Sequence, residues 1–167
     1  MTKIKELPDL EENIQALVYT ELQGSEEGIE IIAESLMEAA MECGSDPDQA
    51  WALSGETEVE KLHAFRHAAA ETANLYIEEQ RRNDDRITKL GTDMVIGEQT
   101  FKDLLEQYEE DMNQAGLEGC IFGHALENHL HVNILPEDYE AYEKGIELIR
   151  NWAERTRALH GVLSGEH

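Results

Sequence analysis

The sequence has few cysteines and no long apolar run, and each shortage excludes a class of protein. The two cysteines, Cys43 and Cys120, are too few for a disulfide framework and lack CxxC spacing. We interpret them as buried thiols in a reducing cytosol. No apolar run approaches the roughly 20 residues of a membrane-spanning helix. The opening stretch MTKIKELPDLEEN also lacks the apolar core of a signal peptide.

Basic residues are also scarce. The chain has 13 lysines and arginines against 37 aspartates and glutamates, a formal net charge of −24. A field of this sign repels phosphate groups, so nucleic acids and anionic membranes are poor partners. Two explanations stay open: origin in a salt-rich cell, where acidic surfaces keep proteins soluble, or helix exteriors rich in glutamate. Neither explanation indicates an activity.

The remaining composition is that of an ordinary globular protein. Apolar residues make up 41% and charged residues 30% of the chain. A chain of 167 residues suits one domain. It buries roughly 70% of its unfolded surface and needs no disulfide or structural metal to fold.

Periodicity predicts strands alternating with helices. We expect strands at 14–22, 50–55, 90–96, 117–124 and 129–135, and helices at 25–43, 57–80, 98–115 and 136–160. Ser25 should cap the first helix, Gly44 should end it, and Pro136 should begin the last one. This order favours an α+β fold of ferredoxin-like, split-βαβ type: an antiparallel or mixed sheet with helices packed on one face. No glycine-rich phosphate loop is present, so no nucleotide site is expected.

The most informative stretch is FGHALENHLHVNILP, residues 122–136, which contains three of the seven histidines. Alternation along a strand places His129, His131 and Asn133 on one face, opposite an aliphatic face. A hairpin through ALEN would bring His124 beside His131, because cross-strand neighbours lie about 5 Å apart. Two imidazoles at this separation can share a divalent ion, with a carboxylate from elsewhere as third ligand. The alternative is a solvent-facing strand with polar residues.

A second histidine pair, His63 and His67, has the i, i+4 spacing that suits a metal on a helix. The glutamate of the HExxH motif is missing, however, and the surroundings are rich in alanine. We therefore interpret this pair as the margin of a packed helix. Trp51 and Trp152 are expected to be core or domain-contact aromatics.

Four segments together resemble one family. GHALENHLHVNI, residues 123–134, resembles the GHxGDGNxHxN motif of the C-terminal domain of FAD-linked oxidases, and VLSGEH, residues 162–167, resembles the start of its SxEHGIG motif. LHAFRHAAAE is similar to its Trp-x-x-Arg helix, and KLGTDMVI to its lysine-plus-strand segment. The group includes D-lactate dehydrogenase, the glycolate oxidase flavoprotein subunit and D-2-hydroxyglutarate dehydrogenase. The matches span nearly the whole chain in order and spacing.

The resemblance implies a fragment of an FAD-dependent 2-hydroxy-acid dehydrogenase or oxidase of the D-lactate or glycolate type. It assigns seven residues: metal ligands His124, His131 and Glu166, substrate residues Arg66, Lys89 and Asn133, and the catalytic base His167. The residue types suit the reaction. A divalent ion (zinc, manganese or iron) lowers the pKa of the hydroxyl, a neutral histidine accepts its proton, and arginine holds the carboxylate. Flavin supplies the redox step.

The sequence departs from the family pattern at the hairpin. The motif's Gly-Asp-Gly-Asn is Leu-Glu-Asn-His at 126–129, so His129 stands at a motif asparagine. We expect Asn128 to make the turn in a left-handed conformation. Phe65 also stands where tryptophan is common. These differences put the substrate identity in doubt.

The family's FAD-binding domain and its final segment have no counterpart in the chain. We therefore expect residues 1–167 to be an incomplete C-terminal domain, inactive when isolated, with FAD held mainly by the absent domain. Expected partners are a small 2-hydroxy acid and that FAD-binding domain, and a homodimer stays open. The expected location is the cytoplasm, or the inner face of the membrane for the full-length protein.

Two other functions remain open from the residues alone. One is a free-standing ferredoxin-like module that binds a metal or a small acid without catalysis. The other is an inert acidic scaffold whose histidines are solvated.

Overall fold

The computed structural model describes residues 14–97 and 99–165. The chain forms two compact units with their boundary between Ala68 and Ala69. This boundary lies inside helix α2 (Glu56–Asn83), so one continuous helix runs from the first unit into the second. Each unit is described by itself below.

The first unit contains α1 (Glu26–Glu42), the short 3₁₀ helix η1 (Pro47–Gln49) and the start of α2. Ser25 caps α1 as predicted, its hydroxyl accepting from the Gly28 amide at 3.3 Å. Cys43, at the end of α1, is exposed, so the prediction of a buried thiol is wrong at this position. Trp51 packs edge-on against Phe65, with ring centroids 6.0 Å apart, in agreement with its prediction as a packing aromatic.

Two predicted strands are wrong. Within the described residues, 14–22 and 50–55 are not assigned to a strand. Their β-forming side chains satisfied the sequence pattern, but a strand also requires the edge of a sheet to pair with. Leu17 is 51% and Val18 is 93% exposed, so neither side chain is buried as it would be on the inner face of a sheet.

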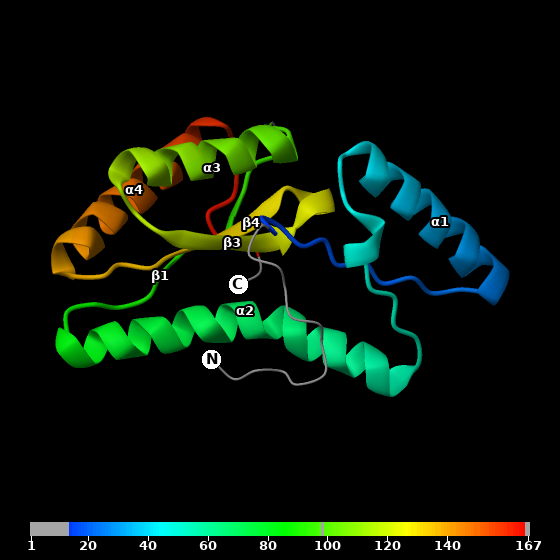
Figure 1. The fold of residues 1–167 in the computed structure, drawn as a ribbon. Helices are drawn as coiled ribbons and strands as arrows, with labels where there is room; N and C mark the ends of the chain where they lie inside the picture. Colours follow the sequence, from blue (N-terminus) through cyan, green and yellow to red (C-terminus); the bar gives the residue numbers. More distant parts are fainter. Residues whose placement is uncertain (1–13, 98, 166–167) are drawn as a thin grey trace. The chain divides into compact units, whose positions relative to one another are not determined.

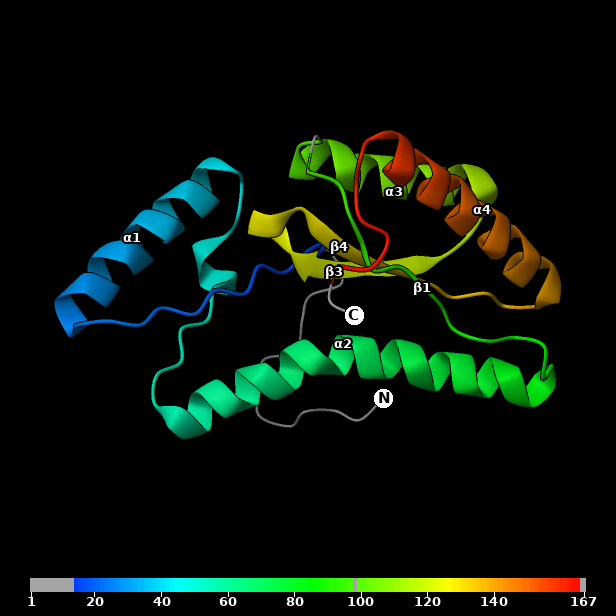
Figure 2. The same ribbon diagram turned by 180° about the vertical axis from the view of Figure 1, so that it is seen from behind.

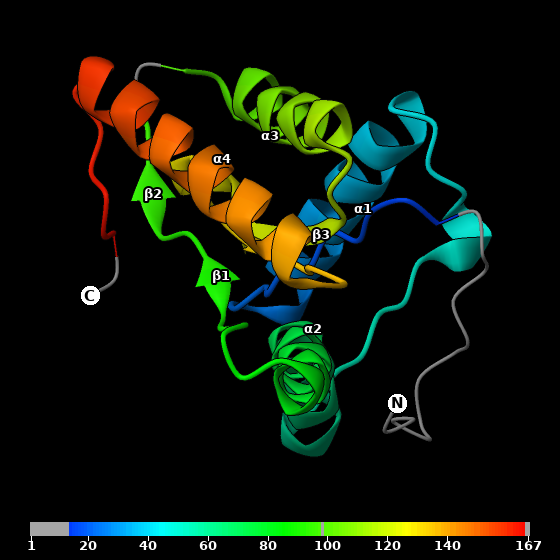
Figure 3. The ribbon, with the colours of Figure 1, turned by 90° about the vertical axis from the view of Figure 1, so that its left-hand side faces the viewer.

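The second unit is built on an antiparallel sheet of β1 (Leu90–Gly91), β2 (Met94–Val95), β3 (Gly119–His124) and β4 (His129–Ile134). β4 is central, with β3 on one side and β1 and β2 in succession along the other. Beyond α4 (Tyr139–Ala158), Val162 forms an antiparallel bridge with Val95, which brings the chain back beside β2 (Figure 3). This is the ferredoxin-like order, so the predicted α+β fold is confirmed.

The predicted strand at 90–96 is interrupted by Thr92. Its amide donates to the Val132 carbonyl at 3.0 Å, but the Val132 amide donates to the Thr92 hydroxyl instead of the Thr92 carbonyl. A side chain thus replaces one bond of the ladder. The backbone carbonyl of Thr92 is left to bind another group.

Helices α3 (Phe101–Ala115) and α4 cover one face of the sheet, as the two opposite views in Figures 1 and 2 show. Their buried side chains meet those of β4 in a single core: Leu104, Tyr108, Met112, Leu130, Val132, Ile134 and Trp152. Tyr108 and Trp152 pack edge to face, with ring centroids 4.8 Å apart. Trp152 is 1% exposed, which confirms its prediction as a core residue.

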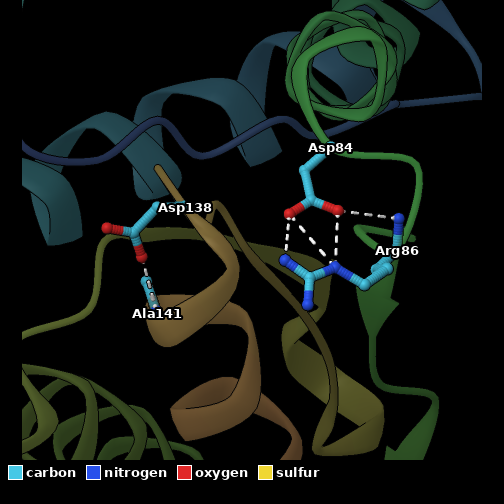
Figure 4. A network of polar contacts seen from close by, with 4 residues as sticks. All are labelled: Asp84, Arg86, Asp138 and Ala141. Atoms are coloured by element: carbon cyan, nitrogen blue, oxygen red, sulfur yellow. Dashed lines mark hydrogen bonds and ion pairs between the residues drawn. The ribbon is translucent and has the colours of Figure 1, made fainter.

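The last helix begins later than predicted. Asp138 caps α4 by accepting the Ala141 amide at 2.8 Å (Figure 4), so Pro136 precedes the helix instead of occupying its first turn. Nearby, the Arg86 guanidinium binds Asp84 and lies over the Tyr139 ring at 3.7 Å. Hydrogen bonds from the Arg86 side chain and amide lower the pKa of Asp84 to about 2. This group joins the end of α2 to the start of α4.

We predict that Tyr108→Phe removes a penalty that grows with pH. The Tyr108 hydroxyl is buried and has no hydrogen-bond partner within the described residues, and burial raises its pKa to about 12. The unfolded chain releases this proton near pH 10. Between pH 10 and 12 the unfolded state therefore binds fewer protons, and stability falls as pH rises. Urea unfolding should show the wild type losing roughly 2 kcal/mol more than the variant across this window.

At pH 7 the same variant should be about 1 kcal/mol more stable than the wild type, because it buries no unpaired hydroxyl. Tyr142→Phe is the control, since the Tyr142 hydroxyl bonds the Thr88 hydroxyl at 2.7 Å. Tyr142→Phe should gain no stability at pH 7, and its stability should still fall above pH 10, because Tyr108 is retained. Equal behaviour of the two variants would contradict the assignment.

Candidate functional site

The hairpin between β3 and β4 closes through a one-turn 3₁₀ helix, η2 (Ala125–Glu127), and Asn128. Asn128 has φ 49° and ψ 34°, which confirms the predicted left-handed conformation. Its side-chain amide donates to the Gln99 carbonyl at 2.6 Å. Asparagine thus supplies the backbone conformation that a motif glycine would otherwise provide, and it also anchors the turn.

The register of the hairpin differs from the expected one. His124 lies opposite His129, and the residue opposite His131 is Phe122, so the expected pairing of His124 with His131 is wrong. The connection, residues 125–128, is the expected one, and it pairs the two residues that flank it, His124 and His129. His124 and His131 still share a face as diagonal neighbours. Ring centroids are 6.1 Å apart for His124 and His129, and 4.4 Å apart for His129 and His131.

Asp93, the residue before β2, reaches the two histidines of β4. Its Oδ1 lies 2.8 Å from His129 Nε2 and 3.7 Å from His131 Nδ1, and its Oδ2 accepts the Ser164 hydroxyl at 3.2 Å. Sequence reasoning missed Asp93. The available signal was an acidic residue inside the apolar pattern LGTDMVI, at a position that alternation assigns to the histidine face.

The interruption at Thr92 adds a fourth polar atom. Because the Thr92 hydroxyl takes the Val132 amide, the Thr92 carbonyl faces the imidazole of His131, at 3.2 Å from Nδ1. One carboxylate oxygen, one carbonyl oxygen and two ring nitrogens therefore converge at one place. The side chains of Asp93, His129 and His131 each offer a metal-ligating atom, all within 4.8 Å of one another.

The histidine face is largely covered, so the alternative of a solvent-facing strand is wrong. His129 is 3% and Asn133 is 4% exposed, and the side chain of His131 is 18% exposed. Backbone packs on the His129 ring: a Cβ added to Gly165 would lie 3.0 Å from Nε2. The alternation along β4 was predicted, but the covering segment was not.

Lys89 and Asn133 lie at the other end of this face. Asn133 pairs with Cys120 on β3 and Gly91 on β1. A Cβ at Gly91 would lie 3.0 Å from Asn133 Oδ1 and 3.4 Å from the Lys89 side chain, so glycine leaves them room. Burial raises the pKa of the half-buried Cys120 thiol.

Three further residues were predicted for the site: Arg66, Glu166 and His167. Arg66 belongs to the first unit, where it is exposed on α2. His63, one turn earlier, binds the Glu21 carboxylate, and this hydrogen bond lowers the pKa of Glu21. Glu166 and His167 lie outside the described residues.

Comparison with known families gives a match over nearly the whole chain. The family described as FAD linked oxidases, C-terminal domain, matches residues 2–167 and so spans both compact units. Among the described residues, every helix is too short or too polar to cross a membrane.

We predict that Gly123→Ala disrupts the hairpin. Gly123 has φ 157°, and a Cβ there would meet the His129 carbonyl oxygen at 2.1 Å, far inside contact distance. The backbone of β3 or β4 must shift, which should lower the free energy of unfolding by about 3 kcal/mol. Urea denaturation followed by circular dichroism measures this change.

Gly97→Ala serves as the matched control, because a Cβ at Gly97 would meet nothing within 4 Å. It should change stability by less than about 0.5 kcal/mol. If both alanines were tolerated equally, the close approach of β3 to β4 at Gly123 would be wrong.

Proposed function

The chain belongs to the family of FAD-linked oxidase C-terminal domains, and from this premise we propose that it supplies the substrate side of a flavin-dependent 2-hydroxy-acid dehydrogenase or oxidase. The family makes the chain a domain of flavin-dependent oxidoreductases, which implies FAD and a partner FAD-binding domain. The finer proposal is a substrate of the D-lactate or glycolate type. We also propose that residues 1–167 act as one such domain, since the match covers both units.

The observation that carries the proposal is the sheltered polar face of β4. His131 and Asn133 stand at the two motif positions of the family pattern, on one face and mostly buried. His131 lies 3.2 Å from the Thr92 carbonyl through its Nδ1, so its ring is held in one orientation on this face. A sheltered face with polar side chains held in place is what a pocket for a small polar substrate requires.

The motif pattern assigns a divalent ion to His124, His131 and Glu166. The described donors fit such an ion, because imidazole nitrogens suit zinc and iron and a carboxylate as third ligand suits manganese as well. When bound, the ion would polarise the substrate hydroxyl and FAD would accept the hydride from C2. The support in this chain is that His124 and His131 share one face of the hairpin.

The chain's own side chains supply the remaining steps. His167 takes the hydroxyl proton, and the loss of this proton together with a hydride converts the 2-hydroxy acid to a 2-oxo acid. Arg66 holds the substrate carboxylate through paired hydrogen bonds, with Lys89 as a second cation. Asn133 lines the pocket, an assignment supported by its place beside Lys89.

We predict that His131→Ala, in the protein that carries the FAD-binding domain, lowers turnover of D-lactate at least 100-fold. The reason is the loss of a ligand that is needed to activate the hydroxyl. Steady-state kinetics with the flavin content held equal measures the effect. His67→Ala, in the first unit, is the control and should retain normal turnover. Near-normal activity of His131→Ala would rule out a metal role for this residue.

Arg66→Ala should act mainly on binding. Loss of a carboxylate clamp is expected to raise KM for D-lactate by roughly 10- to 100-fold. Arg86→Ala is the matched control, since the Arg86 guanidinium binds Asp84. An unchanged KM for Arg66→Ala would transfer the carboxylate role to Lys89.

A further inference from the structure

We propose that Thr92 is a positioning residue, which holds the His131 ring in the tautomer that carries its proton on Nδ1 and its lone pair on Nε2. The use of that lone pair rests on the proposed function, in which His131 is a ligand. Thr92 makes Nε2 the ligand atom of this ring. His129, its neighbour on the same face, is held in the opposite tautomer and supports the site without being a ligand.

Thr92 exchanges one hydrogen-bond acceptor for another without a change of register. The pairs on either side of it keep the same register: Gly91 with Asn133, and Met94 with Leu130. Thr92 therefore lies opposite Val132, to which a regular antiparallel pair would join it by two backbone bonds. Since the Thr92 hydroxyl accepts the Val132 amide at 3.0 Å, the ladder does not need the Thr92 carbonyl, and this oxygen lies 3.2 Å from His131 Nδ1.

The groups around His131 Nδ1 decide which ring nitrogen carries the proton. Nδ1 faces the Thr92 carbonyl oxygen at 3.2 Å and Asp93 Oδ1 at 3.7 Å. Carbonyl and carboxylate oxygens only accept hydrogen bonds, so Nδ1 must be the donor. In a neutral imidazole one nitrogen donates and the other accepts, which places the lone pair of His131 on Nε2. A hydrogen bond at one ring nitrogen is the usual means by which proteins select the nitrogen that binds a metal.

His129 is held in the opposite sense. Its Nε2 lies 2.8 Å from Asp93 Oδ1, an acceptor, so Nε2 carries a proton and the lone pair of the neutral ring is on Nδ1. His129 is 3% exposed, and a Cβ added to Gly165 would lie 3.0 Å from its Nε2. His129 is therefore a buried donor to the Asp93 carboxylate. The role of ligand falls to His131, in agreement with the motif pattern.

Packing keeps the plane of the His131 ring in place. Phe122 lies opposite on β3 with ring centroids 5.6 Å apart, and the His129 ring lies 4.4 Å away. Rotation of the His131 ring by half a turn would bring a carbon atom to the Thr92 carbonyl in place of Nδ1 and lose the hydrogen bond. The bond to Thr92 thus sets the tautomer of a ring whose plane is fixed by its neighbours.

Two competing explanations make different predictions. In the first, His131 is a cation that pairs with Asp93, so both of its nitrogens carry protons. In the second, the Thr92 hydroxyl serves the ladder alone, and the tautomer of His131 does not depend on it. Nitrogen NMR separates these explanations from the proposal, because protonated and unprotonated ring nitrogens have different chemical shifts.

The experiment labels the histidines of the 167-residue chain with ¹⁵N and correlates their ring nitrogens and protons at pH 8. A His131→Gln spectrum identifies the signals of His131, for which we expect an unprotonated Nε2. Thr92→Val keeps the shape of the side chain but lets the carbonyl return to the Val132 amide, so the fixed tautomer should be lost. Thr92→Ser keeps the hydroxyl and should keep the tautomer. Thr156→Val is the matched control, because it removes another buried hydroxyl of the same unit, one that donates to Met94 Sδ.

The effect on the reaction is measured in the protein that carries the FAD-binding domain. Loss of a group that orients a metal ligand typically costs about 10- to 100-fold in metal affinity or activity, and Thr92→Val should lower turnover of D-lactate by this factor. Thr92→Ser and Thr156→Val should retain normal turnover. Circular dichroism checks folding, and Thr92→Ala replaces Thr92→Val if the valine variant does not fold.

The wild-type spectrum alone can overturn the proposal, either by two protonated nitrogens in His131 at pH 8 or by a lone pair on Nδ1. A Thr92→Val chain that keeps the wild-type tautomer would also overturn it, as would one that loses the tautomer and oxidises D-lactate normally. The proposed function fails by a different result: a wild-type flavoprotein that oxidises no 2-hydroxy acid, while the tautomers of the 167-residue chain stay as expected.

Discussion

The two-faced packing of β4 is the constraint on which the rest of the second unit depends. Leu130, Val132 and Ile134 are at most 3% exposed against α3 and α4. Each such side chain contributes roughly 1.5–3 kcal/mol by burial. A slip of one residue would move all three into the histidine environment, and the histidines into the core. The apolar face therefore fixes the register, and the register fixes the polar face.

The polar face owes its donor geometry to an irregularity in the neighbouring strand. A regular ladder would have used the Thr92 carbonyl to accept the Val132 amide. The Thr92 hydroxyl accepts that amide instead, so the strand keeps its hydrogen bond while the carbonyl turns to His131. The next residue is Asp93, whose carboxylate reaches the same point. A local exchange of one acceptor for another thus converts a sheet edge into a group of converging ligand atoms.

Elements that depend on the local pattern of apolar and turn residues could be predicted from the sequence. The period of the apolar residues located α1 to α4 of the described residues and the hairpin, and the missing motif glycines pointed to Asn128 as the turn residue. Features that depend on a distant partner were missed. Residues 14–22 have the composition of a strand, yet pairing decides whether one forms. Asp93 stood out as an acidic residue inside LGTDMVI, but only the pairing of the neighbouring strand with β4 shows that its carboxylate reaches His129.

The anchored turn has a consequence for how the second unit opens. The Asn128 side chain holds the Gln99 carbonyl, which lies in the connection that leads into α3. The tip of the hairpin and the entrance of α3 are therefore tied by a bond that bridges 29 positions of sequence. Local fluctuations that expose amides at either place must break it, so both segments are expected to exchange hydrogen as one cooperative unit.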